Sequence, residues 1–434
     1  MKHTKLFALT AALACSGAFG ADTARESDLQ SQLKVLQERM QALEQRERLP
    51  ERDEPEGGGL TAEGSVIAVG QRANARGADD GRRQGRLSYR SDVLLTLPGP
   101  SVGAAKGGLV AQLRFGQGSG VALRPTYTGT VNSTAFDPAA GADESYAIVA
   151  QAYYELVWPL DAGRFNDRAG NRIELTLGKL DIFGLFDQNA VAGDEGSQFL
   201  NNIFVHNPLL DSGGDIAADR YGFAPGARLA YFAEGDAGTA GFSVGVFGAG
   251  SGASFAGSPG RPLVVAQLEA SPRQVNGEAL GNYRVYLWTN GRTEGLDGSA
   301  QRHTGVGVSV DQRVGRDLNL FARLGRRFRG HGSFDHAVTI GLANGGRAWG
   351  RGGDTVGIAV GRLATSSAWR AATADGTLTG AAATGAERSV ELYYRARLSE
   401  KLEISPNMQW IQRPSGDAGA STVRVVSLRA RLGF

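Results

Sequence analysis

From about residue 64 to the last residue, apolar and polar side chains alternate along the chain. In the last segment, 426–434, apolar residues take every second position, and Arg429 and Arg431 lie between them. The segments 390–398 and 402–410 show the same alternation. A period of two is typical of a β-strand with one apolar and one polar face. The chain is therefore predicted to be all-β over most of its length.

The alternating segments number about sixteen between Gly64 and Phe434, an even number as in bacterial outer-membrane barrels, and no helical crossover separates them. Their connections fall into two groups. Short turns and long loops on opposite sides are the outer-membrane arrangement, with both chain ends in the periplasm. The connections after even-numbered segments are short (234–238, around 315, 399–400), and those after odd-numbered segments are long (118–144, 180–221, 366–385).

Two architectures have such strands: a soluble sandwich or propeller, and a membrane barrel with a wet lumen. Arginines lie on the face opposite the aliphatic residues, which is the solvent side of a sandwich or the lumen of a barrel. An export signal, a mature chain without thiols and a terminal aromatic residue favour the barrel. The arginines on this face are Arg284, Arg292, Arg313, Arg323, Arg395, Arg397, Arg429 and Arg431.

The first twenty residues are predicted to be a cleaved signal peptide. Lys2 and Lys5 flank the start of a short apolar run, and small residues at 18–20 offer a cleavage site before Ala21. The single cysteine, Cys15, lies inside this segment, so a lipoprotein signal is the alternative interpretation.

Residues 21–50 have the pattern of a short coiled-coil helix. Apolar residues recur at alternating spacings of four and three, which is the a/d seam of a heptad repeat. Such a helix forms by pairing, so it predicts either a homotrimer or a periplasmic spacer. Residues 51–63, rich in Pro, Glu and Gly, are interpreted as a linker, and 64–434 as the barrel. The seam residues are Leu29, Leu33, Leu36, Met40 and Leu43.

The overall charge is nearly balanced, with 46 basic and 44 acidic residues and a net charge of +2. This balance gives no sign of nucleic-acid binding. Only six of the basic residues are lysine and the other 40 are arginine. Guanidinium groups bind hydroxyls, carboxylates and phosphates in a fixed planar geometry, so this bias matters for any ligand in the lumen.

The longest connection, 180–221, is predicted to fold back into the barrel because it is too apolar to remain in water. Its carboxylates allow two interpretations. They face the wall arginines across a narrow passage and create a field that orients polar solutes, or they pair with these arginines and hold the loop in place. The carboxylates are Asp187, Asp194, Glu195, Asp211 and Asp215.

Aromatic residues on the arginine face also allow two interpretations. They offer flat platforms to a sugar ring, or they fill the lumen or form the girdles at the membrane interfaces. These residues are Tyr286, Trp288, Phe321 and Tyr393.

The sequence gives little support to catalysis, to a metal or to a cofactor. His331 and His336 flank a short turn, which is interpreted as a solvated loop and not as a metal site. Residues 241–245 match the GxSxG string of a serine nucleophile, but that motif needs a turn into a helix and here a strand continues.

Several motifs resemble the carbohydrate-selective porin family of the OprB type. They are Gly178-Lys179-Leu180-Asp181, Phe186-Asp187-Gln188-Asn189, Phe199-Leu200-Asn201-Asn202, Gly226-Ala227-Arg228-Leu229-Ala230, Val390-Glu391-Leu392-Tyr393-Tyr394 and the segment Ile404 to Trp410. The resemblance implies a sixteen-stranded porin of a Gram-negative outer membrane, surrounded by lipid, that passes small sugars through an arginine-rich lumen. The resemblance also implies a monomer. The N-terminal coiled coil departs from many members of the family, so a trimer with a periplasmic stalk is the alternative.

The prediction from the residues and the resemblance together is passive diffusion of carbohydrates and other small polar solutes. An anion or organic-acid porin and a non-conducting envelope scaffold are the alternatives. The residues predicted to line the pore or contact the solute are Arg284, Tyr286, Trp288, Arg313, Arg323, Tyr393, Arg395, Arg429, Asp187, Asp194 and Glu195.

Overall fold

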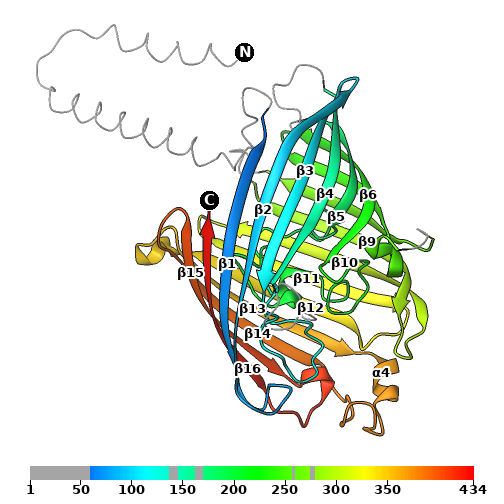
Figure 1. Cartoon of the computed structure of the whole chain (residues 1–434), viewed down its shortest axis with the longest axis vertical. Helices are drawn as coiled ribbons and strands as arrows, with labels where there is room; N and C mark the ends of the chain where they lie inside the picture. Colours follow the sequence, from blue (N-terminus) through cyan, green and yellow to red (C-terminus); the bar gives the residue numbers. More distant parts are fainter. Residues whose placement is uncertain (1–58, 136–144, 162–169, 257–259, 274–278) are drawn as a thin grey trace, which may run out of the picture. The chain divides into compact units, whose positions relative to one another are not determined.

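The computed structural model describes residues 59–135, 145–161, 170–256, 260–273 and 279–434. Over these residues the chain forms one closed antiparallel barrel of sixteen strands (Figure 1). The predicted signal peptide and coiled coil lie outside the described residues. Within the part that the structure describes, no helix is both long and apolar enough to cross a bilayer.

The strands follow one another around the barrel in chain order. They are β1 (Thr61–Ala73), β2 (Gln84–Val102), β3 (Ala105–Gln117), β4 (Ser145–Pro159), β5 (Arg172–Asp181), β6 (Phe223–Gly235), β7 (Gly238–Phe247), β8 (Leu263–Pro272), β9 (Gly281–Glu294), β10 (Ala300–Val314), β11 (Leu318–Arg329), β12 (Phe334–Gly345), β13 (Thr355–Thr365), β14 (Glu387–Arg397), β15 (Leu402–Gln412) and β16 (Val423–Gly433). The helical turns are α3 (Asn202–Val205), α4 (Ser367–Ala372), η1 (Gly250–Ser254), η2 (Gly346–Trp349) and η3 (Pro414–Gly416).

The barrel closes where β1 pairs with β16. Gly64 and Phe434 exchange two backbone hydrogen bonds, N–H to carbonyl oxygen, of 3.0 Å each. Closure leaves no strand edge unpaired. A membrane-spanning sheet must be closed in this way because lipid offers no hydrogen bonds to unpaired backbone groups. β1 begins at Thr61, so residues 61–63 belong to the barrel and not to the linker.

The two faces of the strands are those that the alternation predicts. On β16, Val426 and Leu428 are 45% and 55% exposed on the outside, and Arg429 is 1% exposed on the inside. The connections also alternate, with two residues between β6 and β7 and long loops after β3, β5 and β13. The predicted sixteen-stranded barrel is therefore confirmed.

Glycines on the inner face make room for aromatic rings on the neighbouring strand. Gly307 pairs with Tyr286 and Gly305 with Trp288 across β10 and β9. A Cβ added at Gly307 would lie 2.2 Å from the Tyr286 ring. Gly341 beside Phe321 and Gly357 beside Tyr393 repeat this arrangement. Each ring therefore lies flat enough to leave space above it for another segment of the chain.

We expect Gly307→Val to lower the free energy of unfolding by about 1–3 kcal/mol, because an overpacked interior forces its neighbours away. Thermal unfolding in detergent measures this effect. Gly70→Val is the matched control, since a Cβ at Gly70 meets nothing within 4 Å. Equal melting temperatures for the two variants would contradict the proposed role of Gly307.

Candidate functional site: loop 3 and the arginine wall

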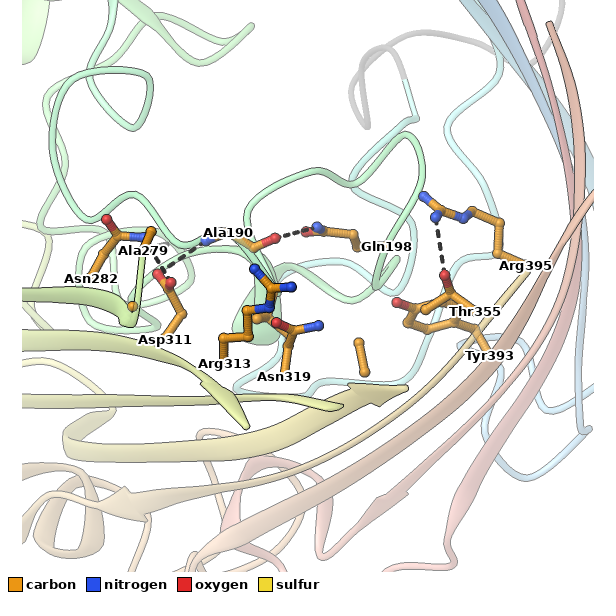
Figure 2. Close-up of a pocket in the computed structure, with 13 residues that line it drawn as sticks. Ala190, Gln198, Ala279, Asn282, Asp311, Arg313, Asn319, Thr355, Tyr393 and Arg395 are labelled. Carbon is orange, nitrogen blue, oxygen red and sulfur yellow. Dashed lines mark hydrogen bonds between the residues drawn. The ribbon is translucent and has the colours of Figure 1, made fainter. Parts of the chain in front are cut away.

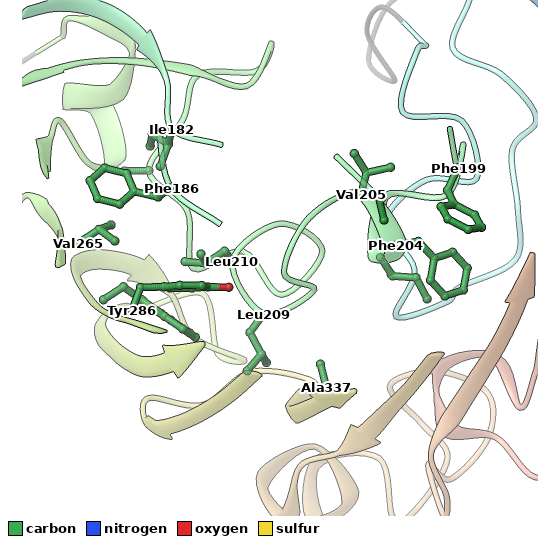
Figure 3. Close-up of a cluster of buried hydrophobic side chains, with 14 of the residues drawn as sticks. Ile182, Phe186, Phe199, Phe204, Val205, Leu209, Leu210, Val265, Tyr286 and Ala337 are labelled. Carbon is green, nitrogen blue, oxygen red and sulfur yellow. The ribbon is translucent and has the colours of Figure 1, made fainter. Parts of the chain in front are cut away.

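Loop 3, the connection 182–222 between β5 and β6, lies inside the barrel against its wall. Phe186, Phe199, Phe204 and Leu209 are fully buried in a cluster with wall side chains such as Val265 (Figure 3). The ring of Phe199 lies 5.5 Å from that of Phe321 and 4.9 Å from that of Tyr393, between centroids. Burial of these apolar side chains supplies the main driving force for the inward path of the loop.

The first polar anchor of loop 3 is an ion pair between Asp187 and Arg323. Arg323 Nε lies 3.0 Å from Asp187 Oδ1, and both side chains are almost completely buried. Tyr286 donates its hydroxyl to the same carboxylate oxygen at 2.7 Å. Arg323 also donates to the backbone carbonyls of Ala192 and Phe204 at 2.7 and 2.6 Å. One wall guanidinium thus fixes three separate points of the loop.

The second anchor is centred on Asp215, near the end of loop 3. Its carboxylate lies 2.6 Å from Arg327 Nη2 and 2.7 Å from His303 Nδ1. Trp288 Nε1 donates to its other oxygen at 2.8 Å. Burial raises the pKa of Asp215, but the hydrogen bond from His303 and the charge of Arg327 outweigh burial and lower it. The carboxylate is therefore charged at neutral pH, and it holds the loop to three strands.

Two glutamates of β14 anchor loops by accepting hydrogen bonds from their backbone. Glu391 accepts from the N–H groups of Leu200 and Asn201 in loop 3, at 2.6 and 3.0 Å. Glu387 accepts from the N–H groups of Tyr127 and Thr128 in the β3–β4 loop, at 2.7 and 2.8 Å. The sequence interpretation gave these residues no role. Their inward position on β14 was visible in the alternation, but their loop partners were not.

A cluster of mixed charge lies where loop 3 approaches β2 and β3. Glu195 Oε1 lies 2.9 Å from Arg90 Nη1, and Asp92 bridges Arg90 and Arg114 at 2.9 and 2.7 Å. Burial raises the pKa of Glu195, but the charges of Arg90, His206 and Arg114 outweigh it and bring the pKa to about 2. These wall residues of β2 and β3 were also missed by the sequence interpretation, although Arg90 and Asp92 alternate with outward-facing residues.

Loop 3 leaves an open cavity between its segment 190–198 and the wall formed by β9 to β14, near the strand ends that are joined by short turns. Its volume is about 340 Å³. Arg313 and Asn319 rise from the wall on one side, Arg395 lies on the other, and Gln198 of loop 3 faces them (Figure 2). Arg395 Nη2 donates to Thr355 Oγ1 at 3.0 Å. The lining combines charged groups with neutral donors and acceptors, the groups that bind hydroxyl-bearing solutes.

The predicted site residues separate into two groups in the structure. The first group is six wall residues that contact loop 3, and one of them, Tyr393, also lines the cavity. The second group is Arg313 and Arg395, which line the cavity without a described contact to loop 3. Within the loop, Asp187 is buried on Arg323, Glu195 is partly exposed beside Arg90, and Asp194 is exposed. The six wall residues are Arg284, Tyr286, Trp288, Arg323, Tyr393 and Arg429.

Arg284 and Arg429 hold loop 3 through its backbone. Arg284 Nη1 donates to the carbonyl of Gln188 at 3.0 Å. Arg429 Nη1 donates to the carbonyls of Glu195 and Gln198 at 2.8 and 2.9 Å. The remaining loop carboxylate, Asp211, pairs with His206 of the same loop at 2.6 Å. Most of the predicted arginines therefore position the loop, and the cavity is lined by fewer of them.

The described residues contain no group of three or more His, Cys, Asp or Glu side chains placed to hold a metal ion. His336 Nδ1 lies 2.6 Å from Asp335 Oδ1 near the start of β12, where His336 is exposed and Asp335 is half-buried. Residues 241–245, with the GxSxG string, lie within β7 and make no turn into a helix.

A closed sixteen-stranded barrel with a loop folded into it is the architecture of a porin, a channel of the bacterial outer membrane. Residues 108–434 match the family described as carbohydrate-selective porin, OprB family. This match spans three quarters of the chain, and the chain belongs to that family. It is accordingly a channel protein and not an enzyme. No curated protein matches the chain by sequence.

Solved structures of other porins share the fold at low sequence identity. OprB of Pseudomonas putida has a TM-score of 0.65 and 17% identity, and the match covers 87% of this chain and 94% of that one. An anion-selective porin from Comamonas acidovorans has a TM-score of 0.52 and 13% identity, with coverages of 87% and 100%. The channel DcaP of Acinetobacter baumannii has a TM-score of 0.50 and 11% identity, with coverages of 88% and 98%. These similarities concern the fold.

We expect Asp187→Asn to lower the free energy of unfolding by about 3–5 kcal/mol, because it leaves the buried Arg323 without its counter-charge. Asparagine tolerates the left-handed backbone of residue 187, where φ is 56°, so the change removes mainly the charge. Unfolding in detergent and single-channel noise measure the effect on loop 3. Asp236→Asn, at an exposed position in the β6–β7 turn, is the control, and an equal loss in both variants would exclude a special role for the buried pair.

We also expect the contribution of Glu195 to stability to depend on pH in one direction. Its pKa of about 2 in the folded chain lies below the ordinary value of about 4.3. The stabilisation is therefore complete above about pH 4.3 and is lost as the pH falls towards 2. The difference in melting temperature between the wild type and Glu195→Gln should shrink over this range. A difference that stays constant down to pH 2 would be inconsistent with the ion pair to Arg90.

Proposed function

We propose that this porin passes carbohydrates and other small polar solutes by passive diffusion, and that its narrowest part lies between loop 3 and the wall of β9 to β14. The observation that carries the proposal is the lining of the cavity. Asn282, Asn319, Thr355 and Gln198 offer neutral donors and acceptors beside Arg313 and Arg395. Such a surface exchanges hydrogen bonds with a polyhydroxylated solute in place of water.

The charge of the cavity supports weak ion selectivity. Asp311 lines the same cavity as Arg313, and Glu403 lies 3.8 Å from Arg395. Because cations and anions of the wall alternate around the passage, neither sign of mobile ion is strongly excluded. A neutral solute crosses such a field without the cost of removing a full charge from water.

Family membership supports the choice of solute, since the matching family is described as carbohydrate-selective. The residues that we propose to contact the solute are a subset of those predicted from the sequence. Arg313, Arg395 and Tyr393 line the cavity directly. The others, including Arg323, Arg429 and Asp187, are proposed to act by fixing the position of loop 3. Asp194 and Glu195 are proposed to supply negative charge on the side of loop 3 that faces the passage.

We expect stepwise conductance in a planar bilayer, partial block by glucose and a small reversal potential in a salt gradient. Arg313→Gln should weaken the glucose block several-fold and shift the reversal potential towards cation selectivity, because it removes a donor and a positive charge from the cavity. Arg388→Gln, at an exposed position on the outer face of β14, is the matched control. Conductance without any effect of glucose in the wild type would contradict the proposal.

An anion or organic-acid porin is the second candidate, and one observation favours it. Arg429 is buried near the passage, and its Nε and Nη2 atoms have no hydrogen-bond partner among the described residues. Strong anion selectivity without glucose block in the same experiment would favour this candidate. A silent bilayer would favour the non-conducting scaffold. Assembly into a trimer through residues 21–50 stays a prediction from the sequence.

A further inference from the structure

Five exposed arginines lie on the outer surface of the barrel, close to the ends of strands that carry the long loops. We call them the arginine belt. In each case the neighbouring inward-facing positions on the strand are buried, so the arginine points away from the lumen. The belt consists of Arg326 on β11, Arg362 on β13, Arg388 on β14, Arg424 on β16 and Arg72 on β1.

The arginine belt lies at the edge of the lipid-facing apolar band that is nearest to the long loops. On β13, Ile358 and Val360 precede Arg362 on the same face and are 41% and 42% exposed. On β16, Arg424 is followed on the same face by Val426 and Leu428. Because long loops mark the exterior side of an outer-membrane barrel, this edge faces the outer leaflet at the level of the lipid headgroups.

The belt brings like charges together without neutralising them. Arg362 and Arg388 are direct cross-strand partners, and directly opposed Cβ atoms lie about 4.5–5.5 Å apart. Among the described residues, none of the five guanidinium groups has an ion pair or a side-chain hydrogen bond. The carboxylate of Asp335, at the outer end of β12, forms a hydrogen bond with His336 at 2.6 Å. Opposed like charges destabilise a sheet unless an anion bridges them.

The belt is also confined to one sector of the barrel. Strands β11 to β16 and β1 are consecutive neighbours around the closed sheet (Figure 1). On the other sector, Tyr89 of β2, Phe115 of β3 and Val246 of β7 are exposed at the same end of their strands. The outward lysine there, Lys179, is paired with Asp219 at 3.0 Å. The five arginines of the belt therefore lie within one run of neighbouring strands in the sheet.

We propose that the arginine belt binds the phosphate groups of a phosphorylated glycolipid of the outer leaflet. A guanidinium group matches a phosphate with two parallel hydrogen bonds, and a phosphate between Arg362 and Arg388 neutralises both. The acyl chains of the same lipid then lie along the apolar band of the barrel, on the side of the belt away from the long loops. This inference requires the barrel to lie in the outer membrane but is independent of the solute that it transports.

The test uses the refolded protein in neutral detergent, titrated with lipid A and observed by native mass spectrometry. We expect Arg362→Gln/Arg388→Gln to weaken lipid A binding by roughly thirtyfold, because it removes two positive charges from beside the lipid phosphate. The matched control is Arg82→Gln/Arg83→Gln, two exposed arginines in the β1–β2 connection outside the belt. Lipid A without its phosphates should bind the wild type as weakly as intact lipid A binds the belt variant.

Single-channel conductance of the belt variant should equal that of the wild type, since neither arginine lines the lumen. This measurement shows that the variant is folded and separates failure of the inference from failure of the proposed transport function. Equal lipid A binding by the wild type and the belt variant would overturn the inference. An equal loss in the control variant, equal binding of dephosphorylated lipid A, or displacement of lipid A by millimolar inorganic phosphate would also overturn it.

Discussion

The position of loop 3 depends on hydrogen bonds between its backbone and charged side chains of the wall. A loop that leaves water must find partners for its N–H and C=O groups, because unpaired ones cost as much as a lost hydrogen bond. Arginines donate to its carbonyls, as Arg323 does to Ala192 and Phe204. Glutamates accept from its N–H groups, as Glu391 does from Leu200 and Asn201. The cavity beneath the loop exists because these contacts hold the segment at a fixed distance from the wall.

The alternation of residues was sufficient to predict the barrel and the direction of most side chains. A strand has a period of two, so once Val426 is assigned to the outside, Arg429 must lie inside. The inward path of residues 180–221 followed from their apolar content. The sequence did not show which charged side chains of the loop are buried and which are exposed. Asp187 and Asp194 are close in sequence, yet one is buried on Arg323 and the other is exposed, because the path of the loop decides which carboxylate meets the wall.

The aromatic residues show the same limit of sequence interpretation. Tyr286 and Trp288 lie on the inner face, but loop 3 covers both rings and uses their polar atoms as donors to Asp187 and Asp215. Gly305 and Gly307 have a role that only the register reveals, since each lies opposite one of these rings. Pairings between distant strands cannot be obtained from local patterns alone.

Buried ion pairs at the base of loop 3 have a consequence for how the pore discriminates. Bringing Asp187 and Arg323 together out of water costs desolvation energy, and their attraction recovers it only in a narrow range of geometry. The pair therefore contributes little net free energy to the stability of the fold, and its main effect is to favour one arrangement of the loop over others. A loop held in this way presents Gln198 and the cavity wall at constant separation. Selection among solutes then depends on fixed size and hydrogen-bond geometry, and large movements of loop 3 would require several buried charges to lose their partners together.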